Sequence, residues 1–133
     1  MSTRTAGQGR TRAGRSLSGF GAYGVVMGIA LCLAPDRTLD LLLTTRTTEH
    51  WVRLLGATAT LLGWYYIVAG RAEVVVLIHA SLWGRLGLAA AFTGLVVAGL
   101  APVLLLGIAG NEMLGVLWTT LALRADARDG APR

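Results

Sequence analysis

Apolar residues fill long stretches of this chain, and the ionisable side chains are confined mostly to the segments between them. No Asp, Glu, Lys, Arg or His occurs in 16–35, 54–70 or 86–111, and the apolar pattern then continues to Leu123, interrupted only by Glu112. The hydrocarbon core of a bilayer is about 30 Å thick, so a helix rising about 1.5 Å per residue needs about 20 apolar residues to cross it. The pattern therefore predicts an all-α membrane protein.

Turn and charge signals divide the chain into predicted membrane spans. The first span, 16–35, ends at Pro35, because a proline followed by charged residues stops a helix. Clustered leucines in the polar segment 36–50 predict a short helix at the membrane interface. The second span covers 51–71 and ends at Gly70 and Arg71.

The start of the third span is open to two interpretations. Either an interfacial segment comes first and the span is 82–101, or one long tilted helix covers 74–100. We favour the long helix, because the apolar run that opens it contains no turn residue. A tight hairpin at Pro102 follows, and the fourth span ends at Leu123.

Composition places nearly the whole chain in one membrane domain. Hydrophobic residues make up 54% and charged residues 14% of the 133 residues, whereas an ordinary soluble domain has about 25% charged residues. We expect residues 1–15 to be a disordered basic arm, 16–124 a four-transmembrane-helix bundle and 125–133 a charged tail.

All twelve basic residues are arginine, and their distribution predicts the orientation. With the N-terminus inside, the cytoplasmic side carries eight of them, namely Arg4, Arg10, Arg12, Arg15, Arg71, Arg124, Arg128 and Arg133. The outer side carries three, Arg37, Arg46 and Arg53. Because positive charge is retained on the cytoplasmic side, both termini are predicted to be cytoplasmic. The arginines are scattered singly and lack stacking aromatics, so we expect membrane lipids, and no nucleic acid, as partners.

Small residues predict how the helices pack, since close backbone approach brings helices together in lipid. The third span carries a continuous small face, made of Gly84, Gly87, Ala91, Gly94 and Ala98. The first span has a Gly24–Gly28 pair, and Gly56 with Thr60 forms a similar pair on the second. These faces outnumber the contacts that one small bundle needs, so association with further copies or with a partner subunit is an open alternative.

Glu112 is the sharpest candidate for chemistry. It lies near mid-bilayer, about ten residues into the fourth span, where a carboxyl group must be protonated, paired or in contact with a wet cavity. In a functional interpretation, Glu112 carries protons, acts as an acid or base, or binds the polar group of a lipid-like ligand. In a structural interpretation, it forms a hydrogen bond or an ion pair between helices. The side chain of the adjacent Asn111 points about 100° away around the helix, so exposing both polar side chains to lipid would cost free energy.

Arg85 is the second ionisable residue well inside a predicted span. The hairpin between the third and fourth spans places it beside Thr119, more than one helical turn from Glu112. A direct ion pair would then strain both side chains, so Arg53 on the second span competes with Arg85 as the partner of Glu112. In the alternative interpretation, the Arg85 guanidinium extends to the inner headgroups and binds nothing else.

Three consecutive aromatic residues, Trp64, Tyr65 and Tyr66, cover about 200° of a helix surface, so at least one of them must point into the bundle. A buried tyrosine hydroxyl needs a partner, which Arg85 at a similar depth can supply. His79, near the inner interface, can titrate near neutral pH. No other ligand-type residue accompanies it in the pattern, so neither a metal nor a cofactor is predicted.

The chain resembles small four-helix bacterial membrane proteins of the DoxX-like or BphX-like kind. The likeness is carried by the segments 51–56 (WVRLLG), 63–71 (GWYYIVAGR), 80–85 (ASLWGR) and 112–119 (EMLGVLWT). It covers most of 17–124 and is one of layout, so it implies a multi-pass protein of the bacterial cytoplasmic membrane and assigns no site residues. Small multidrug exporters share the size and the four spans, but their essential glutamate lies in the first span, where this chain has no carboxylate.

The leading functional hypothesis is a membrane protein that binds a lipid-like or isoprenoid-like molecule, or serves as a small membrane subunit, through an intramembrane polar cluster. The candidate ligand-binding residues are Glu112, Asn111, Arg85, Tyr65, Tyr66, Trp64 and His79. One alternative is an intramembrane isomerase or cyclase that uses Glu112 as a catalytic acid or base and aromatic rings to stabilise a cation. Another is a proton-coupled small transporter.

Overall fold

The computed structural model describes residues 10–41 and 50–130, and within them the chain forms α-helices and no strand. The helices are α1 (Arg12–Leu33), α2 (Pro35–Leu41), α3 (Trp51–Arg71), α4 (Val75–Val97) and α5 (Leu104–Arg128). All except α2 are long and apolar enough to cross a membrane. The predicted all-α fold is therefore confirmed for the described residues, with four helices of membrane-spanning length, and the third of them is one continuous helix from Val75 to Val97.

Two helix boundaries differ from the predicted ones because polar residues cap or extend the helices. Thr11 caps α1 by accepting a hydrogen bond from the backbone N–H of Gly14, so residues 12–15 of the expected disordered arm are helical. At the other end of the chain, α5 continues beyond Leu123 to Arg128. The expected arm at 1–9 and the polar segment at 42–49 lie outside the described residues.

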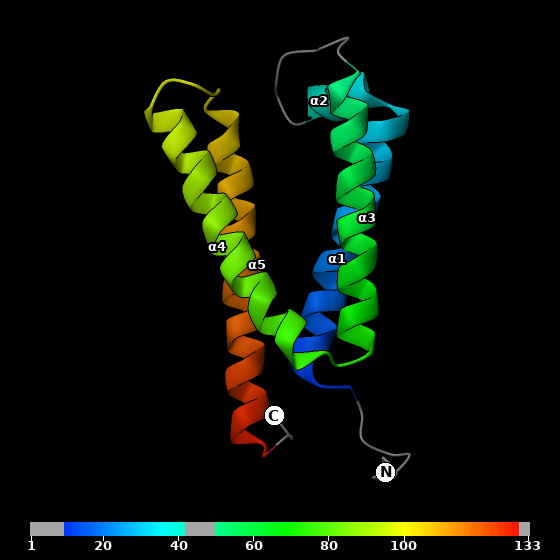
Figure 1. The fold of residues 1–133 in the computed structure, drawn as a ribbon, viewed down its shortest axis with the longest axis vertical. Helices are drawn as coiled ribbons and strands as arrows, with labels where there is room; N and C mark the ends of the chain where they lie inside the picture. Colours follow the sequence, from blue (N-terminus) through cyan, green and yellow to red (C-terminus); the bar gives the residue numbers. More distant parts are fainter. Residues whose placement is uncertain (1–9, 42–49, 131–133) are drawn as a thin grey trace.

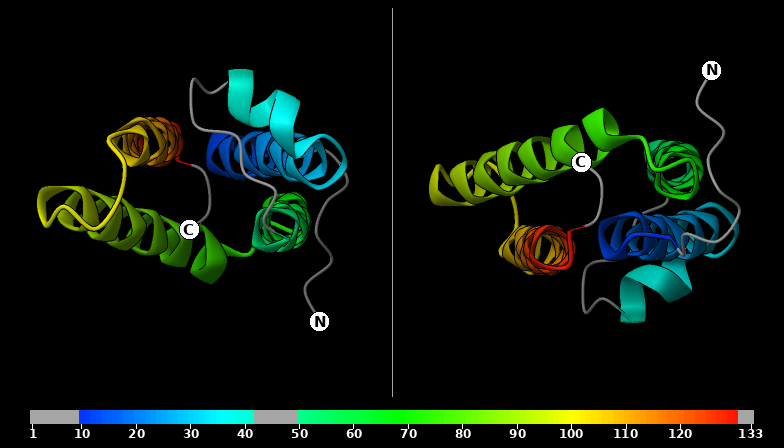
Figure 2. Two further views of the ribbon diagram at one scale, coloured as in Figure 1. Left: turned by 90° about the horizontal axis from the view of Figure 1, so that it is seen from above. Right: turned by 90° about the horizontal axis from the view of Figure 1, so that it is seen from below.

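The four long helices form two antiparallel pairs, α1 with α3 and α4 with α5 (Figure 1). The pairs meet at the end where α1 and α4 begin and α3 and α5 finish, which we call the closed end. They diverge toward the opposite end, where α2 lies beside the α1–α3 pair, and the views along the helices show the same separation (Figure 2). The buried apolar cluster of Ala13, Leu17, Ala69, Ile78 and Ala122 lies at the closed end.

Glycines at seven-residue spacing hold α1 against α3. Three on α1 face three on α3 in antiparallel register, as Gly14 with Gly70, Gly21 with Gly63, and Gly28 with Gly56. A Cβ atom added to any of the three α1 glycines would lie 2.6 Å from the carbonyl oxygen of its partner. The two backbones are therefore in contact, which is the packing that small residues permit in lipid. This also confirms the packing role predicted for Gly28, Gly56 and Thr60, which meet at one crossing.

The small face predicted on the third span does not pack in this way. A Cβ atom added to Gly84, Gly87 or Gly94 would have no neighbouring atom within 4 Å, and Gly107 and Gly110 of α5 are equally open. The expectation that this face joins helices of the bundle is therefore wrong for the described part of the chain. The reason is rotational, because the face of α4 turned inward carries Ile78, Ser81, Arg85 and Ala89.

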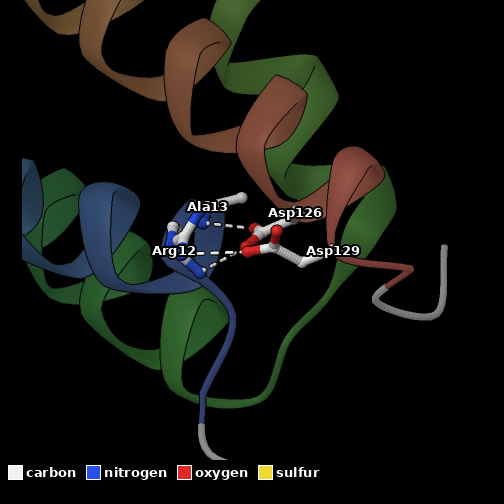
Figure 3. Close-up of polar contacts among 4 residues, drawn as sticks. All are labelled: Arg12, Ala13, Asp126 and Asp129. Atoms are coloured by element: carbon white, nitrogen blue, oxygen red, sulfur yellow. Dashed lines mark hydrogen bonds and ion pairs between the residues drawn. The ribbon is translucent and has the colours of Figure 1, made fainter.

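Carboxylates fix the N-terminus of α1 at the closed end. Asp126 of α5 accepts hydrogen bonds from the backbone N–H groups of Arg12 and Ala13, at 3.0 and 2.9 Å (Figure 3). Asp129 pairs with the Arg12 guanidinium at 2.9 Å, and Glu73 accepts from the backbone N–H of Thr11 at 2.8 Å. The first N–H groups of a helix lack partners and carry partial positive charge, so carboxylates stabilise them. We call Asp126 and Glu73 with their α1 partners the N-terminal clamp.

Candidate ligand site where the two helix pairs meet

Arg85 occupies the point where all four long helices converge. It projects from α4 and is only 2% exposed. Its guanidinium carbon lies 3.6 Å from the centre of the Phe20 ring on α1 and 5.2 Å from the centre of the Tyr66 ring on α3. On α5, the absence of a side chain at Gly115 makes room for it, since a Cβ atom there would lie 2.9 Å from Nη1 of Arg85.

The guanidinium of Arg85 is buried without hydrogen-bond partners. Its Nε, Nη1 and Nη2 atoms meet the geometry of a hydrogen bond with no residue of the described chain, although the Tyr66 side chain interacts electrostatically with the guanidinium. An ion removed from water loses several kcal/mol of solvation, in order of magnitude. A desolvated cation–π contact returns about 2 kcal/mol. The Phe20 and Tyr66 rings therefore offset only part of this cost.

Glu112 is the carboxyl-bearing residue that interacts with Arg85 in this arrangement. The half-buried carboxyl interacts electrostatically with the guanidinium, although the two side chains form no direct ion pair. Arg85 packs at Gly115, which is three residues and so about one helical turn from Glu112. Thr119, the residue that the sequence places beside Arg85, accepts a hydrogen bond from Ser16 of α1 at 3.2 Å.

The other candidate partner of Glu112 is engaged elsewhere. The guanidinium of Arg53 donates to the backbone carbonyl of Cys32, and the Cys32 thiol donates back to the carbonyl of Arg53 at 3.2 Å. This contact joins the last turn of α1 to the first turn of α3. Of the two arginines that the sequence leaves in competition, the structure thus brings Arg85 to Glu112.

Of the three consecutive aromatics, only Tyr66 takes part in the site. Trp64 and Tyr65 are 56% and 57% exposed on the outer face of α3, whereas the partly buried Tyr66 ring faces Arg85. At least one aromatic was predicted to point inward, and Tyr66 is that residue. The other two remain on a surface suited to lipid.

Two further candidates make no hydrogen bond with Arg85 within the described residues. His79 is exposed near the start of α4, with its Nδ1 atom 3.0 Å from the carbonyl oxygen of Val75. Asn111 is half-buried beside Glu112 and makes no hydrogen bond within the described residues. No group of three or more His, Cys, Asp or Glu side chains in the described ranges is arranged to hold a metal ion.

Sequence reasoning missed Phe20 and Gly115, the two residues that shape the space around Arg85. A phenylalanine in an apolar span and a glycine among many carry no local signal of this role. The seven-residue spacing of Gly14, Gly21 and Gly28 was available as a signal, since a heptad repeat indicates one continuous helix face. Additional glycines between these positions obscure it.

No protein-family model matches this chain, and neither the curated proteins nor the solved structures contain a match to it. The likeness to DoxX-like and BphX-like proteins therefore stays a prediction.

Proposed function

We propose that this protein is a multi-pass membrane protein that binds a lipid-like or isoprenoid-like molecule at the junction of its two helix pairs, with Arg85 as the residue that binds the polar head. The single observation that carries the proposal is a guanidinium, 2% exposed, whose three nitrogen atoms have no hydrogen-bond partner in the described chain. Buried polar groups in native proteins are nearly always hydrogen-bonded, so such an orphan marks a binding function.

The charges around Arg85 favour an uncharged oxygen group as the head. An ionised Glu112 offsets the charge of the guanidinium, so an anionic head would then leave the site with an excess of negative charge. A hydroxyl or carbonyl oxygen accepts from Arg85, and a hydroxyl can also donate to Glu112. The apolar remainder of an isoprenoid alcohol or quinone would lie against the spans. This assignment keeps Glu112 and Arg85 as ligand-binding residues.

Access to Arg85 requires the two helix pairs to move apart near the junction. The N-terminal clamp ties them together at the closed end, whereas α1 and α3 have separated from α4 and α5 toward the other end (Figure 1). A small rotation about the clamp therefore exposes the guanidinium to a ligand that arrives from the lipid. Hinge motions of this kind are a common route to a closed site.

The proposal includes the location. The arginine distribution supports a bacterial cytoplasmic membrane with both termini on the cytoplasmic side, which makes the closed end the cytoplasmic one. A role as the membrane subunit of a larger assembly is compatible with the same site. An isomerase or cyclase is favoured less, because the Phe20 ring that would stabilise a substrate cation is already covered by Arg85 at 3.6 Å. No specific contact supports a proton-coupled transporter.

Native mass spectrometry of the solubilised protein tests the proposal. The wild type is loaded with a long-chain isoprenoid alcohol or with a fatty acid of similar length, beside Arg85→Met, Glu112→Gln and the distant control Arg128→Gln. We expect the wild type and the control to retain the alcohol and Arg85→Met to lose it. Glu112→Gln leaves an uncompensated cation, so it should shift retention toward the fatty acid. Equal retention by the wild type and Arg85→Met would refute the proposal.

A further inference from the structure

A cavity at the closed end offers a second site, separate from Arg85. It has a volume of about 310 Å³ and lies between the start of α4, the last turns of α5 and the N-terminus of α1. Its polar lining includes Glu73, His79, Thr120, Arg124 and Asp126, and its apolar lining includes residues of α4 and α5. This volume is at the lower end of the range for small-molecule sites, about 300–1,000 Å³.

The cavity carries both signs of charge, and each sign has unused hydrogen-bonding capacity. Arg124 makes no hydrogen bond or ion pair within the described residues, so its donors are free. Each carboxylate oxygen of Glu73 and Asp126 accepts one hydrogen bond, all four of them from residues at the start of α1. A carboxylate can accept about four, so roughly half of this capacity remains.

These charges discriminate between classes of lipid headgroup. A purely anionic phosphate next to Arg124 would be repelled by the two carboxylates, and a purely cationic group would be repelled by Arg124. A zwitterion that combines a phosphate with a primary ammonium meets both signs at once. The ammonium brings three hydrogen-bond donors, which match the remaining acceptor sites of Glu73 and Asp126 better than a quaternary ammonium with none.

The position of the cavity is that of a lipid headgroup. It lies where all four long helices begin or end, which places it at the membrane surface rather than at mid-span. Val75, Ile78 and Leu123 form an apolar wall beside the charged residues. We propose that this cavity binds the headgroup of an aminophospholipid, with its phosphate on Arg124, its ammonium on Glu73 and Asp126, and an acyl chain along that apolar wall.

Lipid retention in native mass spectrometry tests this site. The full chain is reconstituted with equal amounts of phosphatidylethanolamine, phosphatidylglycerol and phosphatidylcholine, as the wild type, Arg124→Gln and Arg128→Gln. Arg128 is exposed one turn further along α5 and does not line the cavity, so it is the matched control. The wild type and the control should retain phosphatidylethanolamine over the other lipids. Loss of a charged hydrogen bond in Arg124→Gln should reduce this retention about tenfold.

Three outcomes would overturn the assignment. They are a preference for phosphatidylglycerol, an equal loss in Arg124→Gln and Arg128→Gln, and equal retention of soluble phosphoethanolamine in place of the lipid. Arg85→Met serves as the control for the other site. Arg85 lies seven residues, or about 10 Å, beyond Ile78 along α4, so this variant should retain phosphatidylethanolamine even though it loses the isoprenoid alcohol. The two proposals can therefore fail separately.

Discussion

The two helix pairs use the same residue type in opposite ways. In the α1–α3 pair, six glycines in a heptad register bring one backbone against the other. In the α4–α5 pair, Gly84, Gly87, Gly94, Gly107 and Gly110 have no neighbouring atom within 4 Å of an added Cβ position. A glycine therefore promotes close packing only where its face is turned toward another helix.

This difference is tied to where the polar side chains point. The inward face of α4 is occupied by Ser81 and the large, charged Arg85, which hold neighbouring helices at side-chain distance. The facing surfaces of α1 and α3 carry glycines at their three crossings, so the two backbones can touch there. The α1–α3 pair is closely packed, and the α4–α5 pair carries the charges of the proposed site.

The largest effect is expected from breaking the glycine register. Gly21→Ala places a Cβ atom 2.6 Å from the carbonyl oxygen of Gly63, so the helices must separate. Overpacking of this kind costs about 1–3 kcal/mol. Gly94→Ala is the matched control, because it adds the same methyl group to an open face. Thermal unfolding in detergent should show a lowered midpoint for Gly21→Ala alone, and equal midpoints would show that this register does not stabilise the pair.

The next effect concerns the clamp that joins the two pairs. Asp126→Asn removes the charge that caps two N–H groups of α1, which should cost about 1–2 kcal/mol. Asp129→Asn breaks only the ion pair with Arg12, whose side chains are 57% and 62% exposed, so we expect less than about 1 kcal/mol. Spin labels on α3 and α5 should report a wider distance distribution for Asp126→Asn. A larger change in the Asp129 variant would contradict this ranking.

Arg85→Met tests whether the charge on α4 serves stability or binding. Methionine fills a similar volume without a buried charge, and such replacements are often neutral or stabilising. The unfolding midpoint should stay level or rise by the equivalent of about 1 kcal/mol, while the isoprenoid alcohol is lost. A strong destabilisation would instead assign Arg85 a structural role, with Glu112 as its essential partner.

The smallest effect is expected at the hydrogen bond between Ser16 of α1 and Thr119 of α5. Both residues are fully buried, and the bond crosses between the two pairs. Hydrogen bonds between membrane helices contribute about 0.6 kcal/mol on average. Thr119→Val keeps the shape and should lower stability by about this amount in the same unfolding assay. A loss as large as that of Asp126→Asn would mean that this contact, rather than the clamp, joins the pairs.

Several features of the site could be predicted from single residues, and others could not. Glu112 and Arg85 were identifiable because a charge within a span is conspicuous. The three successive aromatics required one inward ring, but only the structure showed that it is Tyr66. Which arginine approaches Glu112 depends on the rotation and depth of α4 relative to α5. This relative position depends on both helices together, and a shift of α4 by one helical turn would change which arginine approaches Glu112.

The sequence by itself determined the four long apolar helices, the short helix after the first of them and the turn at Pro102. These follow from local physics, because a chain in lipid must satisfy its backbone hydrogen bonds within each apolar segment. Only the tertiary structure decided which glycines touch, that Phe20 and Gly115 enclose Arg85, and that Asp126 caps α1. Each of these is a contact between segments far apart in the chain. It depends on how each helix is rotated about its axis, and the hydropathy of the sequence does not report that rotation.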